Sequence, residues 1–64
     1  MFDNHMYNLF MQIVEEHQSL WRMRGLYRED AVDCDRCKDF WDELADRKEK
    51  TIEELEELIK SHLE

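Results

Sequence analysis

Apolar residues recur at three- and four-residue steps along two stretches of the sequence, which is the spacing of one face of an α-helix. The first stretch comprises Met6, Leu9, Phe10, Ile13, Val14, Leu20 and Trp21. The second comprises Cys37, Phe40, Trp41, Leu44, Ile52, Leu55, Leu58, Ile59 and Leu63. The 64 residues include no proline and one glycine, so the turns that a sheet of short strands requires are missing. The sequence predicts an all-α protein, one domain over 1–64 folded as an antiparallel helical hairpin.

The single glycine, Gly25, lies between the two stretches and indicates where the first helix ends. A glycine just past a helix end with an apolar residue behind it, here Leu26, is typical of a Schellman stop. The predicted elements are a helix over about 4–24, a turn over about 25–33 and a helix over about 34–63. In a second interpretation the first helix continues to Tyr27 or Arg28, because both fall on the same apolar stripe.

Each apolar stripe is too wide for one neighbouring helix to cover. At about 100° per residue, each stripe spans roughly 140° around its helix. Two hairpins side by side give every helix two neighbours, as in a four-helix bundle, and a chain this short has a marginal core of its own. We therefore expect a homodimeric bundle or larger oligomer, or a different helical protein bound through the same surface. The expected interface residues are Phe10, Val14, Trp21, Phe40, Trp41, Ile52 and Ile59.

The charge and hydropathy patterns argue against several classes of partner. The net charge is −8, and residues 33–64 carry twelve acidic and six basic side chains, so phosphate backbones are repelled and nucleic acid is not expected as a ligand. The longest apolar run has three residues, far fewer than a membrane span needs. No basic start followed by an apolar block marks a signal peptide. We expect a cytoplasmic protein, whose cysteines are reduced.

Cys34 and Cys37 form a CxxC motif at the predicted start of the second helix, where the spacing puts both sulfurs on one side. Zinc takes four ligands. If the turn is centred near residue 31, two residues that face each other across the hairpin have numbers that add up to roughly 62. By this rule no histidine of the same hairpin lies close enough to reach the cysteines. A zinc site would therefore need Cys34 and Cys37 of two chains.

Two other interpretations of the motif remain open. In a thiol-redox role, the helix N-terminus and Arg24 or Arg28 would lower a thiol pKa, whereas the neighbouring aspartates would raise it. In the simplest interpretation, Cys34 and Cys37 are reduced and pack as small apolar residues near the turn.

His17 and Lys48 interrupt the centres of the two stripes and are predicted to face each other approximately. They form either a polar layer that restricts register and partner, or a core histidine beside a lysine that reaches outward along the seam. An ammonium in this position has to reach solvent or meet a carboxylate, such as that of Glu16. Replacing Lys48 with leucine is expected to raise stability and to broaden the distribution of oligomers.

No set of residues indicates catalysis. The Glu-x-x-His step of di-metal carboxylate bundles is missing, as are a Ser/His/Asp set and a glycine-rich phosphate loop. We expect that the protein is not an enzyme. The leading interpretation is a small acidic intracellular interaction or scaffold protein that acts as a homo-oligomer. The alternative is a zinc-binding or thiol-redox module built on Cys34 and Cys37.

Overall fold

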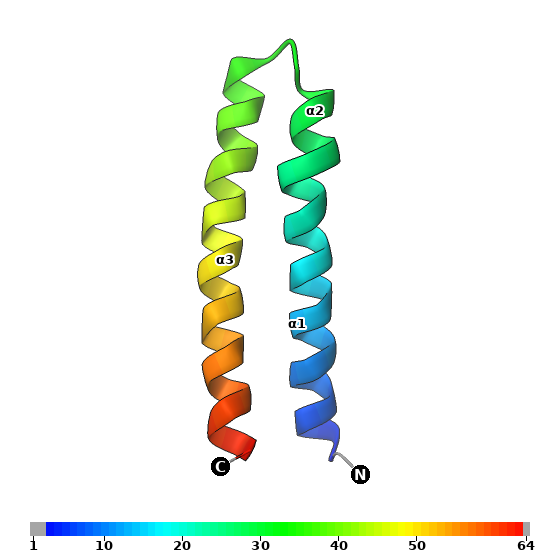
Figure 1. The fold of residues 1–64 in the computed structure, drawn as a ribbon, viewed down its shortest axis with the longest axis vertical. Helices are drawn as coiled ribbons and strands as arrows, with labels where there is room; N and C mark the ends of the chain where they lie inside the picture. The colour runs from blue at the N-terminus through cyan, green and yellow to red at the C-terminus, as the bar shows by residue number, and fades with distance from the viewer. Residues whose placement is uncertain (1–2, 64) are drawn as a thin grey trace.

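Two helical arms run antiparallel and side by side in the computed structural model, which describes residues 3–63 (Figure 1). The first arm consists of helix α1 (Asn4–Arg22), the π-helical segment η1 (Met23–Tyr27) and the short helix α2 (Arg28–Asp30). The second arm is the single helix α3 (Asp35–Leu63). Over the described residues there are no strands, so the predicted all-α class is confirmed and the two arms form a hairpin.

The first arm begins at Asp3, which caps α1. Its backbone is extended, and its side-chain Oδ1 accepts a hydrogen bond of 2.8 Å from the N–H of Met6. The carbonyl of Asp3 accepts the N–H of Tyr7 at 3.0 Å, which closes the first helical turn. A short acceptor at this position satisfies an N–H that has no partner within the helix.

The first arm continues past Gly25, where a Schellman stop was predicted. Such a stop needs a left-handed glycine, and no glycine of the chain has positive φ. Gly25 instead lies inside η1, and the arm ends at Asp30, so the predicted turn over 25–33 is wrong for its first six residues. The continued helix lets the ring of Tyr27 pack against Trp41, with ring centroids 4.9 Å apart.

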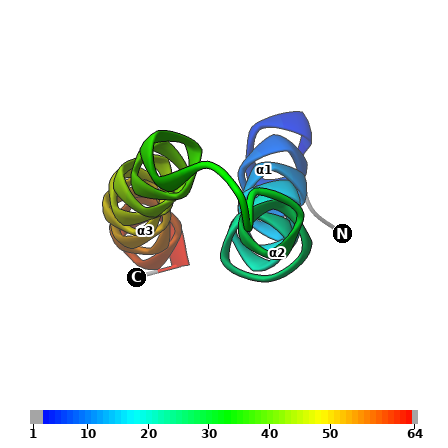
Figure 2. The same ribbon diagram turned by 90° about the horizontal axis from the view of Figure 1, so that it is seen from above.

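The connection between the arms is therefore short and occupies residues 31–34 (Figure 2). The N–H of Ala31 donates to the carbonyls of Tyr27 and Arg28, and the N–H of Cys34 donates to the carbonyl of Ala31 at 3.0 Å. The carbonyl of Cys34 in turn accepts the N–H of Lys38, so α3 starts within one residue of its predicted position.

The later turn changes the register between the arms. Glu16 contacts Lys48 and Arg28 contacts Asp42, so these facing positions sum to 64 and 70 rather than to about 62. The difference arises because the first arm is extended to Asp30, which moves the centre of the turn along the chain.

The core of this elongated hairpin is a narrow seam between the arms. The buried apolar residues among those described are Met6, Met23, Ala45, Ile52 and Ile59. Many large apolar side chains remain exposed, Trp21 most of all, with 74% of its surface accessible. Within residues 3–63, the helices are too short or too polar to cross a lipid bilayer.

Candidate functional site

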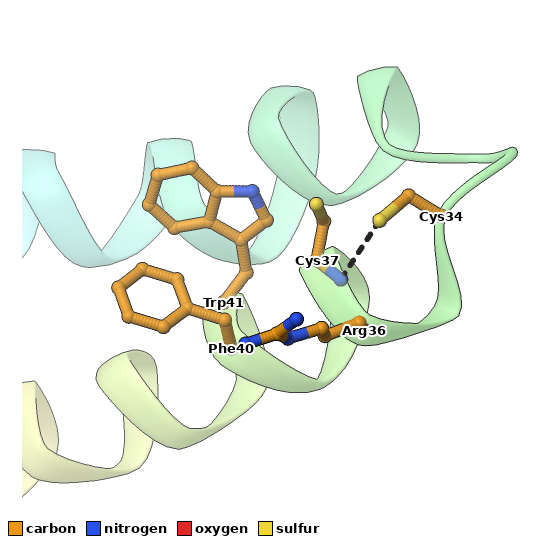
Figure 3. Close-up of a pocket in the computed structure, with 5 residues that line it drawn as sticks. All are labelled: Cys34, Arg36, Cys37, Phe40 and Trp41. Carbon is orange, nitrogen blue, oxygen red and sulfur yellow. Dashed lines mark hydrogen bonds between the residues drawn. The ribbon is translucent and has the colours of Figure 1, made fainter.

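Cys34 caps α3 with its sulfur. It is the last residue before the helix, and its Sγ accepts a hydrogen bond of 3.2 Å from the backbone N–H of Cys37 (Figure 3). Serine, threonine, aspartate or asparagine usually accepts this bond. A thiolate accepts it more strongly than a thiol, because the donor is neutral and the sulfur is charged. The CxxC motif therefore holds one sulfur at the positive end of a long helix.

The two thiols differ in acidity. The thiol of Cys37 donates a hydrogen bond that lowers the pKa of Cys34, and the backbone N–H of Cys37 lowers it further. Partial burial and the charge of Asp35 oppose this shift. The same hydrogen bond between the two thiols raises the pKa of Cys37, although the charge of Arg36 acts in the opposite direction. Cys34 is therefore the first sulfur to ionise, and Cys37 keeps the proton that stabilises it.

Aromatic side chains line the space beside the two sulfurs. A cavity of about 480 Å³, open to solvent, is bordered by Cys34, Arg36, Cys37, Phe40 and Trp41 (Figure 3). The ring centroids of Phe40 and Trp41 lie 5.4 Å apart in an edge-to-face arrangement. Cys34 is half-buried and Cys37 is exposed. The site is a solvent-accessible thiol pair beside an apolar wall.

The arginines that were expected to act on the thiols are engaged elsewhere. Arg24 forms ion pairs with Asp46 and Glu49 at 3.3 and 2.8 Å. Arg28 forms an ion pair with Asp42 at 3.0 Å. The basic side chain at the cysteines is instead Arg36, which lies within the motif itself.

The thiol pair does not form a complete metal site within one chain. Over residues 3–63, no group of three or more histidine, cysteine, aspartate or glutamate side chains is placed to hold a metal ion. Cys34 and Cys37 offer two ligands, whereas a closed structural zinc site needs four protein ligands. A closed zinc site at this motif would therefore require ligands from a second chain.

Lys48 meets Glu16 rather than His17. Its Nζ lies 2.7 Å from Glu16 Oε2, which is the contact that the sequence suggested for this ammonium. The contact joins two side chains that are largely shielded from solvent. His17, the other member of the expected polar layer, is exposed.

The expected interface residues fall into three groups. Ile52 and Ile59 are buried in the seam of the hairpin itself. Phe10 and Trp41 are half-buried. The exposed members are Val14, Trp21 and Phe40.

Six of the ten large exposed apolar residues among those described lie in two groups along the long helices, and the other four are Leu26, Tyr27, Val32 and Leu63. We call the α1 stripe the set Tyr7, Met11, Val14 and Trp21. We call the α3 stripe the set Phe40, Leu44 and Leu58, of which Leu44 is half-buried. The sequence suggested one wide stripe per helix, but the structure divides each into a part that faces the seam and a part that stays exposed.

The α1 stripe lies on the Arg24 side of the seam. Successive residues are about 100° apart around the helix axis, and half-buried Leu20 faces the seam. In a view down the axis, Glu16 and Arg24 lie on opposite sides of Leu20. Trp21 and Val14 lie roughly 100–120° from Leu20, in the same direction as Arg24. Tyr7, Val14 and Trp21 therefore share a side of the hairpin with the ion pairs of Arg24 and face away from the ion pair of Glu16, whereas Met11 lies directly opposite the seam.

The α3 stripe lies on the other side. Ala45 and Ile52 are buried and mark the direction in which α3 faces the seam. Around the axis of α3, Lys48 lies roughly 50° to one side of this direction and Glu49 roughly 50° to the other. Phe40 lies in the direction of Lys48, which pairs with Glu16, whereas Glu49 pairs with Arg24. The two stripes therefore face opposite sides of the hairpin. This relation was not visible in the sequence, because it depends on how the arms are paired.

Comparison of the sequence with protein-family models, with curated proteins and with solved structures found no match. The thiol pair and the two apolar stripes are the features from which we infer a function.

Proposed function

We propose that the hairpin is a small helical interaction module and that a second copy of the chain binds to its α1 stripe. The spacing of the stripe carries this proposal. Tyr7, Met11, Val14 and Trp21 follow steps of four, three and seven residues, which is the repeat of a coiled-coil seam. Such a seam accepts another helix lengthwise, and exposed tryptophan is the type of residue that supplies much of the binding energy at interfaces.

The distribution of charge supports α1 as the contacting helix. Between Asn4 and Arg22 there are two acidic side chains and one basic side chain. Between Asp35 and Leu63 there are ten acidic and six basic side chains. Two identical chains repel each other less when they meet through α1 than when they meet through α3.

The opposite orientation of the stripes also limits the form of the dimer. Two hairpins stacked face to face cover the α1 stripe or the α3 stripe, but not both. A contact along one helix of 19 residues is about 28 Å long. It buries less than the roughly 800 Å² per partner of a typical stable complex. We therefore propose a reversible dimer joined by α1, in place of a four-helix bundle with one shared core.

Sedimentation velocity over about two orders of magnitude in concentration tests this proposal, because mass action shifts a reversible dimer. The chain should move from monomer to dimer, and Trp21→Glu should remain monomeric. Leu58→Glu, on the opposite side, is the matched control and should dimerise like the wild type. Circular dichroism verifies that both variants are helical.

Two results would contradict the α1 dimer. The first is a wild-type chain that is monomeric at every concentration. The second is a dimer that survives Trp21→Glu and is lost in Leu58→Glu, which would assign the interface to the α3 stripe.

A second candidate function, thiol–disulfide exchange, is favoured by the acidity of Cys34. A Cys34 thiolate attacks a small disulfide such as glutathione disulfide and releases one glutathione thiolate. The Cys37 thiol then loses its proton to solvent, and the resulting thiolate attacks the Cys34 sulfur of the mixed disulfide and releases the second glutathione as its thiolate. The products are a Cys34–Cys37 disulfide and two reduced glutathiones, so two electrons pass from the protein to the small disulfide.

Equilibration in glutathione redox buffers, followed by mass spectrometry, tests this candidate. The wild type should form the internal disulfide without retaining glutathione. Cys37→Ser should stop at the mixed disulfide on Cys34, because it lacks the resolving thiol. Cys34→Ser is the matched control and should accumulate less adduct on Cys37, because the backbone hydrogen bond that stabilises a thiolate at the start of α3 is made to the sulfur of Cys34. Equal adduct on both single-cysteine variants would contradict the assignment of Cys34 as the attacking sulfur.

Zinc shared by Cys34 and Cys37 of two chains would require a different interface. Cys37 lies one helical turn from Phe40 and therefore belongs to the side of the α3 stripe. A dimer joined by α1 keeps the two cysteine pairs on the outer sides. Native mass spectrometry distinguishes the arrangements, because shared zinc adds one ion per two chains.

A further inference from the structure

His5 and His62 lie against each other at the end of the hairpin opposite to the turn. His5 is in the first turn of α1 and His62 is in the last turn of α3, and Figure 1 shows that these ends of the two arms lie together. The Nε2 atoms of the two rings are 3.2 Å apart. The ring centroids are 4.8 Å apart, and the ring planes meet at 75°. Both side chains are exposed, so the pair is accessible to solutes.

The separation of the two nitrogens matches that of two ligands of one metal ion. Histidine nitrogens bind zinc at about 2.0–2.1 Å, and two of them at a tetrahedral angle are roughly 3.3 Å apart. The observed separation of 3.2 Å therefore needs little change, and each ring turns by roughly 35° to aim its lone pair at the ion rather than along the line between the nitrogens. A zinc ion placed between the two nitrogens would replace the hydrogen bond that now joins them.

We propose that His5 and His62 bind one zinc ion through their Nε2 atoms in an open site, in which two water molecules fill the positions that protein ligands occupy in a closed structural site. In the hydrogen-bonded pair one ring carries its proton on Nε2. That ring moves the proton to Nδ1 through solvent, so both rings present a lone pair and the net charge of the protein ligands stays zero. The net charge of −8 favours the approach of a divalent cation.

This site would act as a clip between the arms. Its ligands are 57 positions apart in the sequence, so only the folded hairpin brings them together. An ion that binds the folded chain and not the unfolded chain stabilises the fold by mass action. The clip fastens the open end of the hairpin, which is the end that the turn constrains least. It is independent of the α1 stripe and of the cysteines.

Zinc-dependent thermal melting tests the clip. The experiment uses Cys34→Ser/Cys37→Ser protein, because the thiols compete for zinc and serine is a good helix cap. In neutral or slightly alkaline buffer, the melting temperature should rise by roughly 10–20 °C at zinc concentrations about 100-fold above the dissociation constant. The rise should disappear in His5→Ala and in His62→Ala. His17→Ala is the matched control, since His17 is exposed on α1 outside the pair, and should keep the rise.

Isothermal titration calorimetry on the same proteins gives the stoichiometry, which should be one zinc per chain. An unchanged melting temperature in the wild-type histidine background would overturn the proposal. So would a rise that persists in His62→Ala, or one that is lost in His17→Ala. A stoichiometry of half a zinc per chain would also contradict the intrachain clip, because the ion would then join two hairpins.

Discussion

Glu16 and Lys48 form an ion pair across the seam of the hairpin, with Lys48 Nζ 2.7 Å from Glu16 Oε2. Their side chains are only 14% and 22% exposed, so neither charge is well solvated. The amide of Gln12 donates to the other carboxylate oxygen of Glu16 at 2.8 Å. Each charge therefore depends on the other for its stabilisation, and the removal of one leaves its partner uncompensated.

This geometry changes the outcome expected for Lys48→Leu. Seen as an interruption of an apolar stripe, Lys48 should be replaceable by leucine with a gain in stability. In the structure, leucine would leave the carboxylate of Glu16 without its counter-ion, so we expect a loss of about 1–3 kcal/mol in the free energy of unfolding. Urea denaturation measures this loss. Lys50→Leu, at an exposed position of the same helix, should change stability by less than about 0.5 kcal/mol.

The double variant Glu16→Leu/Lys48→Leu completes the test. Without either charge, the seam should recover most of the lost stability, because two apolar side chains replace a poorly solvated pair. A single Lys48→Leu variant that is more stable than the wild type would show that the ion pair contributes nothing.

Acid should weaken the hairpin through Glu16. The contact with Lys48 lowers the pKa of the Glu16 carboxyl below its ordinary value near 4.5, and the amide of Gln12 assists, although partial burial opposes the shift. A lowered pKa in the folded state means that the carboxylate stabilises the fold above about pH 4.5. This contribution disappears as the pH falls through the lower pKa of the folded state. In Glu16→Gln, the free energy of unfolding should therefore fall less steeply than in the wild type as the pH is lowered.

Glu15→Gln is the control for this pH dependence, because Glu15 is an exposed neighbour on the same helix. It should keep the acid dependence of the wild type when stability is measured by urea denaturation at a series of pH values. If both variants have the same acid dependence as the wild type, Glu16 is not a source of it.

Gly25→Ala distinguishes the observed helix from the predicted stop. In η1 the backbone of Gly25 has no positive φ, and an added Cβ meets nothing within 4 Å. Alanine should therefore stabilise the hairpin by about 0.5–1 kcal/mol, since it loses less backbone entropy on folding than glycine does. Thermal melting should show an increase of several degrees. At a left-handed helix stop, alanine would be strained and the melting temperature would fall instead.

The two thiols should react with iodoacetamide at different pH values. The pKa of Cys34 is lowered mainly by the hydrogen bond from the Cys37 thiol, so its thiolate should form and react at lower pH than that of Cys37. Peptide mass spectrometry after brief alkylation gives both rates in one sample. Cys37→Ser keeps a side-chain donor and should preserve the reactivity of Cys34 at low pH, whereas Cys37→Ala should reduce it. Equal behaviour of the serine and alanine variants would show that the side-chain donor is unimportant.

The sequence by itself determined the features that arise within a few residues of each other. The apolar periodicity of 4–24 and 34–63 fixes two amphipathic helices, because only a helix brings those positions to one face. The position of Asp3 provides an N-cap, and the CxxC spacing brings Cys34 and Cys37 together on one side of a helix start. Each of these needs only the local geometry of the backbone.

The tertiary structure decided everything that depends on the pairing of the arms. The contact between Tyr27 and Trp41 accompanies the continuation of the helix through Gly25, although that glycine resembled a stop. The resulting register places Glu16 opposite Lys48. It also divides the exposed apolar residues between opposite sides of the hairpin and brings together two histidines 57 positions apart. A shift of one or two residues between the arms rotates side chains by 100–200° around each helix, and no local pattern specifies that shift.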